Sequence, residues 1–147
     1  QSVQNEIDIL DKQIKIVVDE INSPIITIPG IGYTLAAIIL AEIGDIERFM
    51  NPAKLLAFAG MEPSTYQSGK FNASKTPMVK RGSTYLRWAI LQAARLVPMR
   101  DATFSTYLAK KLSEGKHYNV ARSHVGKKLL RVIFYLLKNN TAFVPQM

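Results

Sequence analysis

The stretch ITIPGIGYTLAAIILAEIGD, residues 26–45, decides the fold of the chain because it joins two helical segments through a tight turn. Pro29, Gly30 and Gly32 form the turn, and the apolar residues after them predict a helix over 33–43. Two helices joined in this way resemble a helix-hairpin-helix element. Glycines lack a Cβ, so such a turn can approach a phosphate closely, with the opening amides of the second helix facing the anion. A plain turn between two helices is the alternative.

Side chains that can cap helices mark out the rest of the chain. Ser23, Asn51, Ser83 and Asp101 each precede a helical pattern, and their oxygens can accept the free amides of a first turn. We expect helices over 3–21, 24–28, 52–60, 84–97, 102–114 and 119–138. The sequence therefore predicts an all-α fold, with a compact helical domain over 23–147 and a coiled-coil-like helical arm over 1–22.

The N-terminal segment carries a heptad repeat. Its apolar residues are spaced alternately four and three apart, and they are Val3, Ile7, Leu10, Ile14, Val17 and Ile21. A period of 3.5 residues is typical of coiled coils, which makes a homodimer through this helix one option. The repeat spans under three heptads, so an amphipathic helix docked on its own domain is the other option.

Charge is distributed unevenly along the chain. The net charge is +8, but residues 1–66 contain 4 basic and 9 acidic side chains, whereas 67–147 contain 15 basic and 2 acidic. Such a positive field suits a polyanion, either nucleic acid or an anionic membrane surface. The apolar run Leu35–Ala41 is far shorter than the roughly 18 residues of a spanning helix, so we expect no membrane partner. The absence of cysteine excludes a thiol nucleophile and a cysteine-ligated zinc site.

A stretch without periodicity, 61–82, carries the candidate catalytic group. Connections of this length in a compact domain are usually functional. Ser68 could attack a phosphate if nearby cations stabilised the developing charge, and Gly69 would let a substrate backbone come close. The cations available are Lys70, Lys75, Lys80, Arg81 and, one turn into the next helix, Arg87. An ordinary Ser-Gly turn is the alternative. Three neighbouring serines compete for the role: Ser64, Ser74 and Ser83.

Basic residues continue through the last two predicted helices, interleaved with aromatic residues that could stack on exposed bases. The aromatic candidates are Phe71, Tyr85, Trp88, Tyr107 and Tyr118. Trp88 stands among apolar positions of its helix, so we expect it in the core. His117 and His124 are seven residues apart without a third ligand, which indicates surface or phosphate contacts and no metal site in this chain.

Four motifs in a fixed order carry a resemblance to a known family. They are PGIG at 29–32, F-x-N-P-x-x-L-x-x-F-A-G at 49–60, P-x-x-Y-x-S-G at 63–69 and K-R-G-x-x-x-L-R at 80–87. Over 28–94 the chain resembles the C-terminal transposase domain of the bridge-RNA-guided insertion-sequence transposases, also called bridge recombinases. The heptad helix is similar to the coiled coil that this family places between its two domains.

The resemblance implies that Ser68 is a nucleophile that forms a covalent phosphoserine link to DNA. It also implies a guide RNA and an N-terminal RuvC-like domain, whose four acidic residues bind a divalent metal such as Mg²⁺. The chain's own acidic residues do not replace that domain, so the chain resembles half of an enzyme and holds no cofactor of its own. Gly30 and Gly32 would shape the hairpin and are also expected to contact DNA. The residues expected to contact DNA near Ser68 are Gly69, Lys70, Lys75, Lys80, Arg81 and Arg87.

Two other classes of function stay open. A non-catalytic module that binds DNA or structured RNA would use the same basic helices. An adaptor that dimerises through its N-terminal helix would explain the heptads but leave the positive charge unused. Spaced acidic residues in a RuvC-like pattern upstream of Gln1 would favour the transposase, which we expect in the cytoplasm of a bacterium or archaeon, associated with the nucleoid.

Overall fold

The computed structural model describes residues 2–61 and 82–146, and every regular element within these two ranges is helical. The elements in chain order are α1 (Ser2–Ile21), η1 (Pro24–Thr27), α2 (Tyr33–Ile43), η2 (Ile46–Arg48), α3 (Pro52–Phe58), α4 (Thr84–Leu96), η5 (Val97–Met99), α5 (Ala102–Ser113) and α6 (Tyr118–Asn139). The elements labelled η are short 3₁₀ helices. The predicted all-α fold is therefore confirmed over the described residues.

Capping side chains set the helix boundaries. The side chain of Asn51 accepts the amide of Lys54 at 3.0 Å, and that of Asp101 accepts the amide of Phe104 at the same distance. Ser23 and Ser83 cap η1 and α4 in the same way. Because these contacts are local in sequence, each predicted helix boundary lies within two residues of the observed one.

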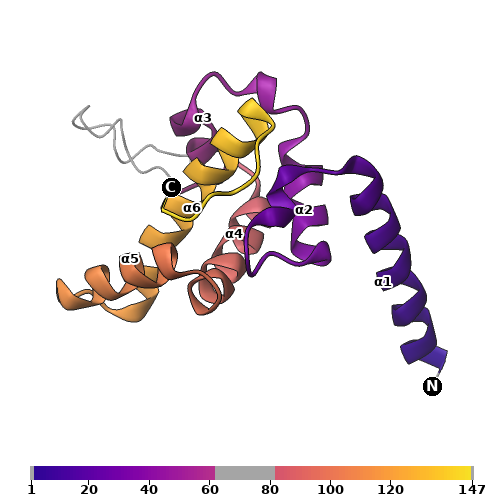
Figure 1. Ribbon diagram of the computed structural model, residues 1–147, viewed down its shortest axis with the longest axis horizontal. Coiled ribbons are helices and arrows are strands. Elements are labelled where there is room, and N and C mark those ends of the chain that lie inside the picture. The colour runs from indigo at the N-terminus through magenta and orange to yellow at the C-terminus, as the bar shows by residue number, and fades with distance from the viewer. Residues whose placement is uncertain (1, 62–81, 147) are drawn as a thin grey trace.

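The hydrophobic core of the described residues is built around α4, which packs against both α2 and α6 (Figure 1). The buried residues of α4 recur every three to four positions, as expected for a helix with one face in the core. They are Leu86, Ala89, Ile90, Ala93 and Ala94. Phe104 of α5 is fully buried, as are Leu129 and Ile133 of α6. The core therefore fixes α4 from both sides.

Trp88 lies outside this core, so the prediction that it would be buried is wrong. The buried stripe that starts at Leu86 and Ala89 sets the rotation of α4, and Trp88 falls on the other side of the helix. It is 54% exposed, and Tyr85, one turn earlier, is 70% exposed. The apolar neighbours of Trp88 in the sequence are thus not its neighbours on the helix surface.

The N-terminal helix α1 extends away from the rest of the molecule (Figure 1). It packs against α2 and buries Val18, while the ammonium of Lys15 lies 5.2 Å from the ring centroid of Tyr33. Val18 is not one of the heptad positions; of those, Ile14 is partly buried and the others are exposed. The helix therefore docks through the edge of its heptad stripe. The division of the chain at residue 22 stays a prediction.

Candidate functional site

Only some of the predicted site residues fall within the described ranges, namely Gly30, Gly32 and Arg87. The others lie outside the described residues, and they are Ser68, Gly69, Lys70, Lys75, Lys80 and Arg81. The structure does describe the base of the segment that carries them, on both sides of the gap between 61 and 82. Arg87 is partly buried one turn into α4, and its amide donates to the carbonyl of Ser83 at 3.2 Å.

The two sides of this base are held against each other. The amide of Ser83 donates to the carbonyl oxygen of Phe58 at 2.7 Å, which joins the start of α4 to the end of α3. Gly82 packs so closely on the same carbonyl that an added Cβ would lie 1.9 Å from its oxygen. The glycine of the K-R-G motif therefore has a packing role, because any larger residue would force the backbone apart.

Side chains from α2 and η2 brace the base. Ser83 Oγ donates to Glu42 Oε1 at 2.6 Å and accepts the amide of Leu86 at 2.9 Å. A guanidinium nitrogen of Arg48 donates to the backbone carbonyl of Glu42 at 3.0 Å, and the same guanidinium lies 4.9 Å from the ring centroid of Phe58. Sequence reasoning assigned no role to Glu42 or Arg48, since their partners are distant or on the backbone. Ser83, with both bonds made, is a helix cap.

We call the turn over 29–32, between η1 and α2, the hairpin. Its backbone is tightly packed at Gly30 and has free space beside it at Gly32. Gly30 has φ +102°, and an added Cβ would lie 2.8 Å from the Cα of Val97, so both conformation and packing require glycine there. Gly32 has φ −88° and no atom within 4 Å of an added Cβ. It stands at the N-cap of α2, where no side chain caps the opening amides. Packing therefore explains the first glycine and leaves room for a ligand at the second.

A pocket of about 320 Å³ lies beside this hairpin. The segment Gly30–Gly32 lines one side, and Leu96, Met99 and Arg100 line the other. The hairpin contains no cation of its own, but the fold brings the exposed Arg100 to it from the turn after η5. The sequence did not link this arginine to the hairpin, because 70 positions separate it from Gly30.

A basic groove of about 580 Å³ lies over α5 and α6. It is lined by Tyr107, Lys128, Arg131, Val132 and Tyr135. The ammonium groups of Lys111 and Lys128 each lie 5.3 Å from the ring centroid of Tyr107, so one ring holds two like charges close together. This arrangement concentrates positive charge and suits phosphate groups.

His124 lies near three lysines, one of which is Lys111. Burial lowers the pKa of this histidine, and the positive charges of Lys127, Lys111 and Lys116 lower it further. Within 2–61 and 82–146, no three histidine, cysteine, aspartate or glutamate side chains gather to hold a metal ion. Nor does any helix of the described part have the length and apolar character needed to cross a membrane.

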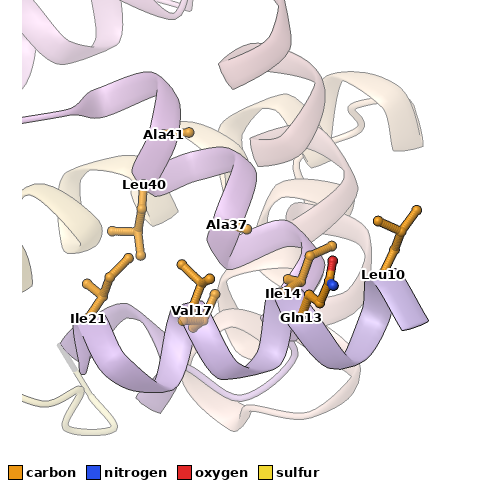
Figure 2. Close-up of a pocket in the computed structure, with 9 residues that line it drawn as sticks. Leu10, Gln13, Ile14, Val17, Ile21, Ala37, Leu40 and Ala41 are labelled. Carbon is orange, nitrogen blue, oxygen red and sulfur yellow. The ribbon is translucent and has the colours of Figure 1, made fainter. Parts of the chain in front are cut away.

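An apolar groove of about 420 Å³ lies between α1 and α2, beside the place where they pack together (Figure 2). Heptad residues line it from α1 and small or aliphatic residues line it from α2. Its lining includes Leu10, Gln13, Ile14, Val17, Ile21, Ala37, Leu40 and Ala41. Gln13 is the polar member of this set, so the groove offers a partner a surface that is almost wholly hydrophobic.

Comparison with known proteins points to one family. Residues 22–109 match the family model described as "Transposase IS116/IS110/IS902 family". The chain is 31% identical over 120 residues to the transposase for insertion sequence element IS1111A of Coxiella burnetii, covering 80% of this chain and 33% of that protein. It is 28% identical over 127 residues to an uncharacterized 43.6 kDa protein of insertion element IS110 from Streptomyces coelicolor, covering 85% and 31% of the two chains.

A third relative is named for inverting a gene and not for an insertion element. The chain is 28% identical over 118 residues to the pilin gene-inverting protein of Moraxella bovis, covering 80% of this chain and 37% of that protein. The chain thus spans about a third of the length of these relatives.

Proposed function

The chain belongs to the IS116/IS110/IS902 transposase family, and we propose that it binds DNA and contributes a serine nucleophile, Ser68, to strand cleavage and joining in a longer protein. The observation that supports the proposal is the hydrogen bond from the Ser83 amide to the Phe58 carbonyl, which joins two described residues that flank the S-G motif in the sequence. A nucleophile needs a defined position, and a backbone hydrogen bond between two helical elements would help to supply it.

In the proposed step, Ser68 Oγ attacks a phosphorus atom of the DNA backbone. An oxygen–phosphorus bond forms to the serine, and the bond from phosphorus to one deoxyribose oxygen breaks. The serine gives up its hydroxyl proton, and the departing deoxyribose oxygen gains a proton and becomes a free hydroxyl. Joining is the reverse reaction with a deoxyribose hydroxyl of another strand. Arg87 and the lysines of the segment would stabilise the negative charge that develops at phosphorus.

Other parts of a longer protein would complete this chemistry. The described residues do not fit Mg²⁺, since no three suitable ligands come together among them. The resemblance assigns that ion to acidic residues of a RuvC-like domain in the longer protein. A guide RNA would select the DNA, as the resemblance to bridge recombinases implies. The protein would meet its substrate in the cytoplasm, on the nucleoid.

The hairpin would hold a phosphate of the bound DNA. The open space at Gly32 would admit the anion, the uncapped amides of α2 would face it, and Arg100 would supply a positive charge. Gly30 would shape the turn and line the pocket beside the ligand. Such contacts position DNA without reading its sequence.

The groove beside α1 would bind a second copy of the chain. The heptad spacing of Leu10, Ile14, Val17 and Ile21 matches what a partner helix needs for knobs-into-holes packing. All four residues line the groove in Figure 2. A second α1 seated there would cover aliphatic side chains that the chain alone leaves in water.

The nucleophile is tested with the full-length protein, its guide RNA and end-labelled DNA. We expect a protein–DNA adduct that survives denaturation, is lost in Ser68→Ala and persists in the matched controls Ser64→Ala and Ser74→Ala. An undiminished adduct in Ser68→Ala would contradict the proposal. DNA binding without any adduct in the unmutated protein would favour a non-catalytic nucleic-acid-binding module.

A further inference from the structure

A row of side chains runs along α4 on the side away from the core, and we name it the α4 face. Its residues are spaced alternately three and four apart: Tyr85, Trp88, Arg95 and, in η5, Met99 are exposed, and Gln92 between them is half-buried. Tyr85, Trp88 and Met99 are 70%, 54% and 75% exposed. Residues at this spacing share one side of a helix, so the row forms a continuous strip.

The α4 face connects the two places where the proposed function puts phosphates. One end follows directly on Ser83, which is bonded to Phe58 at the base of the segment with the S-G motif. The other end reaches Met99, which lines the hairpin pocket together with Arg100. The 13 residues of α4 span about 20 Å. A strand that touched both places would therefore pass along this strip.

The chemistry of the strip combines flat rings with cations. The sequence of α4 contains Arg87 and Arg95 and neither aspartate nor glutamate. Arg95 donates to the side-chain oxygen of Gln92 at 3.2 Å, which holds its guanidinium on the same side as the rings. Aromatic rings beside arginines are the elements with which proteins bind single strands, because bases stack on the rings while cations contact the backbone. Stacking requires unpaired bases, since both faces of a base in a duplex are already covered.

We propose that the α4 face binds unpaired nucleotides of the DNA strand that Ser68 would cut. Bases stack on Tyr85 and Trp88, and Arg95 and Arg100 contact the backbone phosphates. The identity of the strand rests on the proposed function. A strand that has been cut must leave its complement before it can be joined elsewhere, and a surface that holds unpaired bases keeps its end in place meanwhile.

The first test needs no substitution, because Trp88 is the single tryptophan of the chain and its fluorescence reports on the α4 face alone. A 12-nucleotide oligodeoxythymidine is added to the 147-residue chain. In parallel, binding is followed by the fluorescence anisotropy of the same oligonucleotide carrying a dye. We expect saturable quenching of the indole, stronger than with a duplex of equal length. Binding by anisotropy with no change in tryptophan fluorescence would overturn the proposal.

The second test uses variants of exposed residues, which keep the core intact. Trp88→Ala and Tyr85→Ala should each weaken oligodeoxythymidine binding by roughly 5- to 150-fold, the range that corresponds to one stacked base. Trp88→Phe should recover most of the affinity, because it keeps a ring. Met50→Ala changes an 80% exposed nonpolar side chain outside the α4 face, so it is the control and should bind as the unmutated chain does. Equal affinities for Trp88→Ala and the unmutated chain would overturn the proposal, and so would tighter binding of oligouridine.

These measurements are independent of the chemistry at Ser68. The Ser68→Ala chain should bind oligodeoxythymidine with unchanged affinity, because the α4 face is intact. Strand binding lost in Trp88→Ala, with no adduct in the full-length protein, would support the inference and contradict the proposed nucleophile. An adduct at Ser68 together with unchanged binding in Trp88→Ala would support the proposed nucleophile and contradict the inference.

Discussion

The helices α1 and α4 both expose large nonpolar side chains, but the kinds of side chain differ. On α1 the exposed residues are mostly aliphatic, as at Leu10 and Val17, and the helix carries five acidic and two basic residues. On α4 they are the aromatic Tyr85 and Trp88, and the helix carries two arginines and no acid. An aliphatic surface leaves water only by packing on another apolar surface, whereas a ring beside an arginine suits a base and its phosphate. Exposure alone therefore does not identify a partner; side-chain type and charge do.

The two helices also differ in how they are fixed. One full side of α4 is buried between α2 and α6, and Ser83 and Gly82 anchor its first turn to Phe58. In α1 only Val18 is buried. A surface on α4 is therefore a fixed platform suited to positioning a substrate, while α1 leaves most of its nonpolar side chains exposed.

The largest expected effect comes from breaking the anchor of α4. Gly82→Ala should lower the free energy of unfolding by about 3 kcal/mol or more, because the new Cβ overlaps the carbonyl oxygen of Phe58. Thermal unfolding followed by circular dichroism measures it. Gly32→Ala, where an added Cβ meets open space, is the matched control and should cost within about 1 kcal/mol. Equal stability of Gly82→Ala and the unmutated chain would show that the base is not rigid.

The next largest effect is on self-association, which should depend on α1 and not on α4. Replacing both Leu10 and Val17 by glutamate should weaken self-association by about 100-fold or more, because apolar side chains worth roughly 1.5–3 kcal/mol each become charged. Sedimentation velocity should show a dimer for the unmutated chain and a monomer for this variant.

The same variant should bind oligodeoxythymidine normally, and Trp88→Ala should sediment as the unmutated chain does. If either substitution disturbed both properties, the two surfaces would not be distinct and the comparison would fail.

The smallest effect concerns one charge of the α4 face. Arg95→Gln should reduce the salt dependence of single-strand binding, lowering the slope of log K against log salt by about 0.7, the value for one phosphate contact. Lys12→Gln on α1 removes the same charge from an exposed position and should leave the slope unchanged. Identical slopes for Arg95→Gln and Lys12→Gln would show that Arg95 does not contact a phosphate of the strand.

The helices could be predicted from the sequence because the signals that start and stop them are local. Asn51 and Asp101 accept amides three residues ahead, so their roles can be read from neighbouring residues alone. The wrong prediction for Trp88 shows where such reading fails. Its burial depended on the rotation of α4, which the small residues Ala89 and Ala93 help to set by packing on other helices.

Contacts between distant residues could not be predicted in this way. Arg100 reaches the hairpin, and Arg48 braces Phe58, only after the chain has folded. The motif order pointed to an insertion-sequence transposase, and the comparisons show the IS116/IS110/IS902 family. The guide RNA and the role of Ser68 came from a resemblance and stay predictions. The residue that we propose as the nucleophile is thus the one that the local sequence singled out least.

The most direct test of the account is to locate the DNA attachment by mass spectrometry. The full-length protein is reacted with its guide RNA and DNA, denatured, and digested with nuclease and trypsin. Cleavage after Lys54 and Lys70 gives a peptide over 55–70 that contains both Ser64 and Ser68. The account predicts a nucleotide joined through phosphate to Ser68 in the fragment spectrum. A nucleotide on Ser64, or on any other peptide, would contradict it.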